Sequence, residues 1–320
     1  MKLLTYQTDD GATHAGVLTD AGVLDVAAVL GRVTGLRDVQ AVLELPGEPL
    51  AELRARLTHT KVPPVPLATV QLRAPILRPP TIRDFMAYEG HATFSGSRPQ
   101  SEAWYRLPVF YFSNTLCIHG SDETVPLPSA SKRVDFELEI AVVIGKEGRN
   151  IAAADAMDYI AGFTIFNDWS CRDLQRDEMQ VHLGPAKSKD FATSIGPWMV
   201  TPDELAAMLV DQRLKVRGRL SVNGEQWVDS DCGAMHHNWG DLIERASRDS
   251  RIVPGDILGG GTVGGGCILE LTRTPGGPAR FLKAGDVVEI EVDGLGTLRN
   301  TLTPAPIALG DYRYAVPPRA

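Results

Sequence analysis

The chain has 320 residues, of which 43% are apolar and 22% charged, and a formal net charge of −8. This is the composition of an ordinary globular protein with one large domain, or a large and a small one. The acidic balance argues against an extended nucleic-acid surface, which needs clustered basic residues. No apolar run approaches the roughly 18 residues of a membrane span.

Asp9 and Asp10 make the N-terminus acidic too early for a signal peptide. None of the four cysteines forms a C-x-x-C pair. We therefore expect a cytoplasmic protein without a disulfide framework or a zinc site.

The first 70 residues alternate short apolar runs with turns, and Leu50–Leu57 has the spacing of a helix. Prolines at 63, 64, 66, 79 and 80 then interrupt the chain, and such clusters mark turns and linkers. We place a domain boundary near residue 72. The pattern predicts a small N-terminal α+β domain over 1–72 and a larger domain over 73–320.

Most later elements have the character of strands. Strand-like runs cover 105–112, 134–144, 163–167, 216–222, 225–228, 268–272, 287–292 and 296–302. Asn223-Gly224 predicts a type I′ hairpin between two of them. Helices are predicted over 152–160, over 202–210 behind a Thr201 capping box with Pro202 at the first position, and over 238–248. Strands that outnumber short helices, without βαβ alternation, indicate an α+β, mostly β fold.

Paired carboxylates stand at the start of an apolar strand. Side chains alternate along a strand, so Glu137 and Glu139 share one face. A solvated face is one interpretation. Adjacent to apolar residues, however, two carboxylates are costly unless a cation neutralises them. Asp168 ends another apolar run thirty residues later. An oxygen-rich set of this kind suits Mg²⁺, Mn²⁺ or Ca²⁺. Asp135 shares the glutamates' face only if the strand begins there, and we leave it out of the metal set.

Two further segments carry candidate cations. Arg172 and Gln175 stand three apart and share a face of a helical turn. The planar guanidinium suits a carboxylate or an oxyanion, although an ion pair with Asp173 or Asp177 is the alternative. Downstream, Lys187 and Lys189 are either solvated surface charges or, beside a substrate, stabilise negative charge.

A candidate base and a candidate partner are far apart in the sequence. His91 follows Asp84 by seven residues, and histidine is a good general base near neutral pH; an incidental surface residue is the alternative. Near the C-terminus, a glycine-rich run from Gly259 lacks the pattern of a phosphate-binding loop, and its glycines allow tight turns and close backbone approach. Glu270 follows that run as either an exposed charge or a carboxylate that orients a base.

These motifs, in this order, resemble the fumarylacetoacetate hydrolase family over roughly residues 73–303. The resemblance rests on D-F-E-L-E with its following strand (135–145), on F-N-D-W-S-C-R-D-L-Q (166–175), on Gly184-Pro185 with Lys189 and Phe191, and on the closing segments at Gly285-Asp286 and 294–300. It implies a mixed β-sandwich roll with a small N-terminal domain. It also implies a homodimer.

Carried over residue by residue, the resemblance implies four metal ligands, Asp84, Glu137, Glu139 and Asp168. It implies that His91, oriented by Glu270, activates water. Lys189, preferred over Lys187 because of its spacing to Phe191, would act in catalysis. The residues Arg172, Gln175, Tyr111 and Thr262 would contact the substrate.

The expected function is metal-dependent hydrolysis of a carbon–carbon bond in a small anionic β-diketo acid, such as an acylpyruvate or a fumarylacetoacetate-like acid. The divalent metal would be Mg²⁺, with Mn²⁺ or Ca²⁺ as alternatives. A second hypothesis keeps the metal but replaces hydrolysis with decarboxylation, hydration or tautomerisation of a 2-oxo acid. A third hypothesis is a non-catalytic metal- or ligand-binding protein. Fold alone does not choose among these functions.

Overall fold

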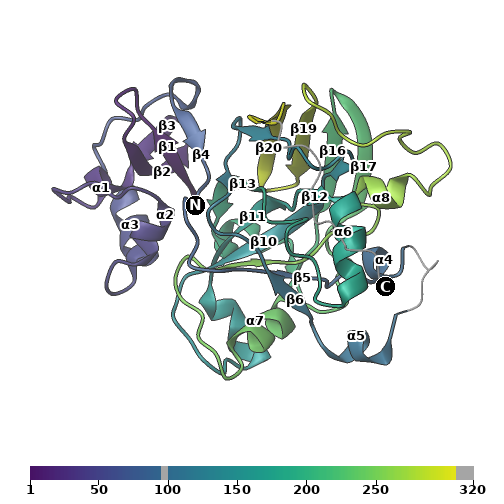
Figure 1. Cartoon of the computed structure of the whole chain (residues 1–320). Helices are drawn as coiled ribbons and strands as arrows, with labels where there is room; N and C mark the ends of the chain where they lie inside the picture. Colours follow the sequence, from purple (N-terminus) through teal and green to yellow (C-terminus); the bar gives the residue numbers. More distant parts are fainter. Residues whose placement is uncertain (95–99, 308–320) are drawn as a thin grey trace, which may run out of the picture.

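The computed structural model describes residues 1–94 and 100–307, and in this part of the chain a large mixed sheet forms the centre (Figure 1). Its main path runs β3-β2-β1-β13-β11-β10-β18-β5-β6, with β4 paired to β1 and β7 paired to β13. The strands are β1 (Lys2–Gln7), β2 (Thr13–Thr19), β3 (Gly22–Asp25), β4 (Gln71–Arg73), β5 (Ile82–Phe85), β6 (Phe110–Phe112), β7 (Ile118–His119), β10 (Leu138–Ile144), β11 (Ile160–Asn167), β13 (Thr193–Val200) and β18 (Ile257–Gly259).

A second sheet packs against the first and has the order β17-β16-β19-β20-β8. Its strands are β8 (Thr124–Pro126), β16 (Arg217–Val222), β17 (Glu225–Asp231), β19 (Val287–Val292) and β20 (Gly296–Thr303). Leu220, Ile290 and Leu298 of this sheet share one apolar cluster with Ile140 and Phe163 of the large sheet. Two short pairs complete the strands, β9 (Val134–Asp135) with β12 (Ser170–Cys171) and β14 (Leu209–Val210) with β15 (Arg213–Leu214). The fold is therefore α+β and mostly β, as predicted.

The helices are short. The α-helices are α1 (Val26–Val29), α2 (Val39–Leu43), α3 (Pro49–Leu57), α4 (Glu89–Ala92), α5 (Glu102–Arg106), α6 (Arg172–Glu178), α7 (Trp239–Ser247) and α8 (Ile268–Leu271). The 3₁₀ helices are η1 (Leu67–Thr69), η2 (Ala153–Tyr159), η3 (Met179–Val181) and η4 (Pro202–Leu205). None of the helices in the described residues is long and apolar enough to cross a bilayer.

Strand register at the centre of the large sheet brings distant acidic residues to one place. Strands β10 and β11 are buried along their whole lengths, as expected for strands covered on both faces. Strand β18 runs parallel to β5 and places Gly259 opposite Asp84, and β6 runs antiparallel on the other side and places Tyr111 opposite Asp84. Strand β10 carries Glu139 beside this group.

The N-terminal segment extends the large sheet, because β1 pairs with β13 through Lys2↔Val200 and Leu3↔Met199. Helices α1, α2 and α3 lie together with β1–β3 at one end of the molecule (Figure 1). Leu3 and Leu53 belong to the same buried cluster as Ile195 and Ile257. The sheet thus continues across the segment boundary, and the predicted domain division near residue 72 stays a prediction.

One predicted strand is helical instead, and another is a strand only in its last part. In the run 105–112, α5 occupies the first part and only Phe110–Phe112 forms a strand. The Ser101 hydroxyl accepts a hydrogen bond from the Trp104 N–H and caps this helix. The run 268–272 begins with helix α8, because the Asp135 carboxylate accepts hydrogen bonds from the Ile268 and Leu269 N–H groups at 2.7 and 3.0 Å. These contacts outweigh the β propensity of the segment.

Other predicted elements differ in length or in detail. The helix at 152–160 is the 3₁₀ helix η2, and the helix at 202–210 ends at Leu205, before β14. The Thr201 hydroxyl does not cap η4; it accepts a hydrogen bond from the N-terminal ammonium at 2.5 Å. The hairpin prediction is confirmed, because Asn223 and Gly224 have φ values of 55° and 80° between β16 and β17, as a type I′ turn requires.

Helix α7 supports the central strands, and its N-terminal cap can be tested. Trp239 packs edge-on against Phe163 at 5.9 Å between ring centroids. Asn238 accepts from the Asp241 N–H, and Asp241 accepts from the Asn238 N–H, which is a reciprocal capping pair. Asn238→Ala should lower the free energy of unfolding by about 1 kcal/mol, measured by urea denaturation. Asn238→Ser keeps a capping oxygen and should lose less. Equal stability of the alanine variant and the wild type would contradict this account.

Candidate active site

Three buried carboxylates meet at the end of the central strands. Oxygens of Asp84, Glu139 and Asp168 lie within 4.8 Å of one another. Within the described residues, Asp84 Oδ1 and Asp168 Oδ1 are buried and have no hydrogen-bond partner. Burial and the neighbouring carboxylates raise the pKa values of Asp84 and Glu139 well above their usual range and raise that of Asp168 to about 6. Unpartnered oxygens among crowded carboxylates fit a hard divalent cation.

Glycines of the run after β18 leave room for this acidic group. A Cβ atom at Gly259 would lie 2.4 Å from Asp84 Oδ1 and 3.3 Å from Glu139 Oε2. The Gly261 N–H donates to Glu139 Oε2 at 3.0 Å, and the Thr262 hydroxyl donates to Glu139 Oε1 at 3.2 Å. Gly261 has φ +86°, a conformation that glycine adopts without strain. The predicted close backbone approach at these glycines is confirmed.

Two buried cations neutralise part of the negative charge. The Lys189 ammonium donates to Glu137 Oε2 at 2.5 Å and also to Asp168 Oδ2. Arg172 donates to Glu137 Oε1 at 2.7 Å. Burial alone would raise the pKa of Glu137, but Lys189 and Arg172 outweigh it and hold that pKa well below its usual value. Both oxygens of Glu137 are thus engaged by cations, and its predicted role as a fourth metal ligand stays a prediction.

Arg172 is occupied by protein groups rather than exposed to the cavity. Besides Glu137, its guanidinium binds Asp135 Oδ2 at 2.7 Å and Gln175 Oε1 at 2.9 Å. Its ion-pair partners are therefore not the neighbouring Asp173 or Asp177. Gln175 lines the cavity, whereas Arg172 is not among the lining residues. Arg172 can position Gln175 and Glu137, and its predicted direct contact with substrate stays a prediction.

The candidate base and its partner meet although they are 179 residues apart. His91 Nδ1 lies 2.8 Å from Glu270 Oε2, with His91 on α4 and Glu270 on α8. The Gly265 N–H donates to the other oxygen of Glu270 at 3.2 Å. The His91 side chain is 17% exposed and that of Glu270 5%. A carboxylate on Nδ1 fixes the ring and, when Nδ1 carries the proton, leaves Nε2 as a base.

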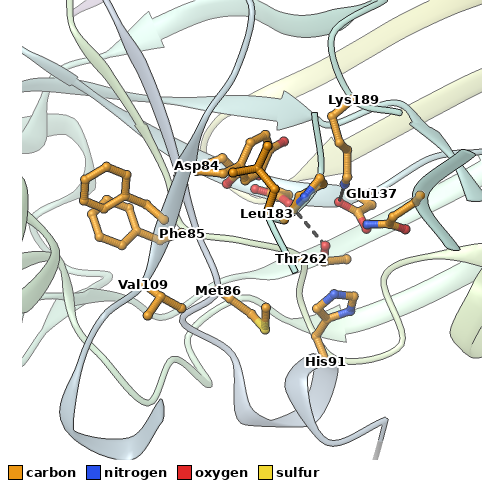
Figure 2. A pocket seen from close by; sticks show the side chains of 15 residues that line it. Asp84, Phe85, Met86, His91, Val109, Glu137, Leu183, Lys189 and Thr262 are labelled. Atoms are coloured by element: carbon orange, nitrogen blue, oxygen red, sulfur yellow. Dashed lines mark hydrogen bonds and ion pairs between the residues drawn. The ribbon is translucent and has the colours of Figure 1, made fainter. Parts of the chain in front are cut away.

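A cavity of about 240 Å³ joins the carboxylates to His91. The side chains of His91, Thr262, Glu137 and Lys189 lie around it (Figure 2). The Tyr111 hydroxyl also lines it and donates to Asp168 Oδ2 at 2.6 Å. The remaining wall is mostly apolar and is formed by Phe85, Met86, Val109, Phe110, Leu183 and Pro185. A small acid with an apolar portion suits this combination of polar floor and apolar wall.

Comparison with known proteins shows the family of this chain. The model of the fumarylacetoacetate (FAA) hydrolase C-terminal domain matches residues 81–303. The chain belongs to this family. It is 35% identical over 262 residues to the mitochondrial oxaloacetate tautomerase Fahd2a of Rattus norvegicus, covering 79% of this chain and 76% of the relative. It is 34% identical over 235 residues to the protein Rv2993c of Mycobacterium tuberculosis, covering 73% and 79%.

Solved structures share the fold over nearly the whole chain. A putative HpcE protein from Mycobacterium smegmatis has a TM-score of 0.73 and 28% identity, covering 95% of this chain and all of that one. The fumarylacetoacetate hydrolase of Exiguobacterium antarcticum has a TM-score of 0.74 and 22% identity, with 95% and 99% coverage. The two packed sheets are therefore the mixed β-sandwich roll that the resemblance implied. Similar proteins are named as tautomerases, isomerases and hydrolases.

Sequence reasoning preferred one of the two lysines and assigned no role to two other residues near the site. Lys189 lines the cavity, whereas the Lys187 side chain is 59% exposed and pairs with Asp190 at 2.9 Å. Sequence reasoning gave no role to Asp135, which joins Arg172 to helix α8, or to Cys267, whose thiol contacts Glu270. Asp135 had a sequence signal, its place in the D-F-E-L-E motif, whereas Cys267 had none.

The space at Gly259 gives a direct test of the carboxylate site. Gly259→Ala places a methyl group against Asp84 Oδ1 and Glu139 Oε2, and should weaken Mn²⁺ binding by roughly 10–100-fold in isothermal titration calorimetry, since disturbing ligand orientation has costs of this size. Gly35→Ala is the control, because an added Cβ there meets its nearest atom at 3.9 Å. Equal Mn²⁺ affinity in the two variants would refute the assignment.

Proposed function

We propose that the protein is a metal-dependent hydrolase that cleaves a carbon–carbon bond in a small β-diketo acid of the acylpyruvate or fumarylacetoacetate type. The observation that carries this proposal is the His91–Glu270 pair at 2.8 Å on the edge of the cavity. An imidazole with one nitrogen held by a carboxylate is the arrangement that activates water or another nucleophile.

The proposed ion is Mg²⁺, held by Asp84, Glu139 and Asp168, with Mn²⁺ or Ca²⁺ as alternatives. The all-oxygen donor set and the two unpartnered carboxylate oxygens support this assignment. When bound, such an ion polarises carbonyl or carboxylate oxygens of a substrate as a Lewis acid. Glu137 lines the same cavity and is proposed as a fourth ligand.

The protein residues then account for the proton transfers. His91 Nε2 takes a proton from water, and the water oxygen bonds to the distal carbonyl carbon of the diketo acid. The bond between that carbon and the central methylene breaks, and its electron pair forms an enolate. The proton on His91 returns to the enolate carbon, which yields a carboxylic acid and a 2-oxo acid.

Charge stabilisation in this scheme falls to Lys189. Its ammonium has three donors, two of which reach Glu137 and Asp168, so the third is available to a developing enolate in the cavity. Gln175, Tyr111 and Thr262 all line the cavity, and we propose that they orient the acid. The apolar wall at Met86, Val109 and Leu183 suits the acyl substituent.

Tautomerisation of a 2-oxo acid is the second candidate. The observation that favours it is the 35% identity to proteins named as oxaloacetate tautomerases. That reaction also needs a base and a stabilised enolate, but no water attack.

The proposed homodimer and cytoplasmic location rest on the family resemblance and on the chain's composition.

Removing the base tests the role of His91. His91→Ala should lower kcat by about 10²–10⁴-fold, the usual contribution of a general base, with unchanged Mn²⁺ affinity because the carboxylate site is separate. Glu270→Gln should lower kcat less, because the ring loses orientation but not the base. His59→Ala, an exposed histidine outside the cavity, is the control. Unchanged turnover in His91→Ala would rule out the mechanism.

A substrate comparison tests the reaction type. Acetylpyruvate, a fumarylacetoacetate-like acid and oxaloacetate are each supplied with Mg²⁺, while the loss of enol absorbance is followed and the products are identified by NMR. We expect cleavage of a diketo acid to two acids. Rapid keto–enol interconversion of oxaloacetate, without cleavage of any diketo acid, would replace hydrolysis with tautomerisation.

A further inference from the structure

A second group of metal-ligating atoms lies beside the carboxylate site and differs from it in chemistry. His91 Nδ1, Cys267 Sγ and an oxygen of Glu270 lie within 4.8 Å of one another. Glu270 Oε2 is the common point, at 2.8 Å from His91 Nδ1 and 3.3 Å from Cys267 Sγ. Imidazole, thiolate and carboxylate together suit Zn²⁺ or Co²⁺. The carboxylate site, which has only oxygen ligands, suits Mg²⁺.

We propose that Zn²⁺, or Co²⁺ as its spectroscopic substitute, binds His91, Cys267 and Glu270 and switches the enzyme off by occupying its base. The inhibitory part of this inference rests on the proposed function, because it assumes that His91 transfers the proton. The binding part rests only on the three ligand atoms.

The surroundings of these atoms favour a cation. Gly265 N–H already satisfies Glu270 Oε1, so Oε2 is the oxygen that faces both His91 and Cys267. A thiolate and a carboxylate balance the charge of one Zn²⁺, which matters because Cys267 and Glu270 are buried. His91 lines the cavity and is partly exposed, which gives the ion an entry path and a side for a fourth, solvent ligand.

Binding changes the protons on both ligands in a defined way. The Cys267 S–H proton leaves to solvent as the Zn–S bond forms, since a thiol binds metal as a thiolate. Nδ1 of His91 must offer its lone pair to the ion, so the proton of the neutral ring moves to Nε2. A protonated Nε2 cannot accept a proton from water. The ion therefore removes the base without displacing a metal from Asp84, Glu139 and Asp168.

The spacing of the cysteines in the sequence gives no sign of this site, because its ligands come from α4, from the residue before α8 and from α8 itself. The N-terminal end of α8 is fixed by Asp135, and this contact brings Cys267 and Glu270 to His91.

Binding is tested first, without substrate. The full-length protein is saturated with Mg²⁺ and titrated with Co²⁺, and the thiolate-to-cobalt charge-transfer absorbance is recorded. In the wild type and in Cys117→Ser, we expect this absorbance to appear and to saturate at one equivalent of Co²⁺. In Cys267→Ser, we expect it to be lost. Cys117 is the control because it is a partly exposed cysteine outside this cluster. Absence of the band from the wild type, or its survival in Cys267→Ser, would overturn the proposed site.

Inhibition is tested next, with each variant's rate in Mg²⁺ alone as its own reference. Zn²⁺ should inhibit the wild type and Cys117→Ser to the same extent at low and high Mg²⁺. Cys267→Ser should need at least about 100-fold more Zn²⁺, since even changes outside the ligand set weaken metal sites by tenfold or more. Relief of inhibition by excess Mg²⁺, with Cys267→Ser as sensitive as the wild type, would place the ion at the carboxylates and refute the inference. A cobalt band in a protein that cleaves no diketo acid would leave the site standing and refute only the proposed function.

Discussion

The contact on which the site depends is that of Arg172 with two buried carboxylates. Its guanidinium binds Asp135 through Nε and Glu137 through Nη2, each at 2.7 Å. Glu137 in turn binds Lys189, which also holds Asp168 of the carboxylate triad. On the other side, Asp135 binds the first N–H groups of α8, the helix that carries Glu270. One continuous chain of ion pairs and hydrogen bonds therefore joins the candidate metal site to the candidate base.

Burial strengthens this network of ion pairs and makes the loss of any one member costly. Asp84, Glu139 and Asp168 have raised pKa values because they are buried and because other carboxylates, Glu137 among them, lie close by. Arg172 and Lys189 are too few to neutralise all the acidic groups around them. Removing one member of a buried ion pair leaves an uncompensated charge, which costs several kcal/mol. A divalent cation offsets the excess negative charge directly, so the crowding of these carboxylates favours a hard ion.

Local sequence was a good guide where neighbours along the chain decide the structure. The strand predicted over 134–144 is interrupted at Phe136 and Glu137 and forms two strands, β9 and β10, in different sheets. Strand β10, the Asn223-Gly224 hairpin and helix α7 follow from period, turn chemistry or capping. The meeting of Asp84, Glu139 and Asp168 was expected from the family resemblance, and strand register produces it.

Contacts between distant residues explain what local sequence could not show. The segment that forms helix α8 was predicted as a strand. The carboxylate that binds its first N–H groups belongs to Asp135, 133 residues away, so the local sequence did not reveal the helix. The alternative ion pair of Arg172 with Asp173 or Asp177 is wrong, because its ion-pair partners lie on and beside strand β9. Asp173 instead accepts hydrogen bonds from Ser131 and Lys132. No periodic pattern records such long-range pairings.

The central claim is that a divalent ion sits on Asp84, Glu139 and Asp168, next to the His91–Glu270 pair. Anomalous diffraction from crystals soaked in Mn²⁺ tests it most directly. The account predicts one strong peak at roughly 2.0–2.6 Å from an oxygen of each of these three carboxylates, and the same map shows whether Glu137 joins them. A map with no peak at these residues, although Mn²⁺ supports turnover, would contradict it.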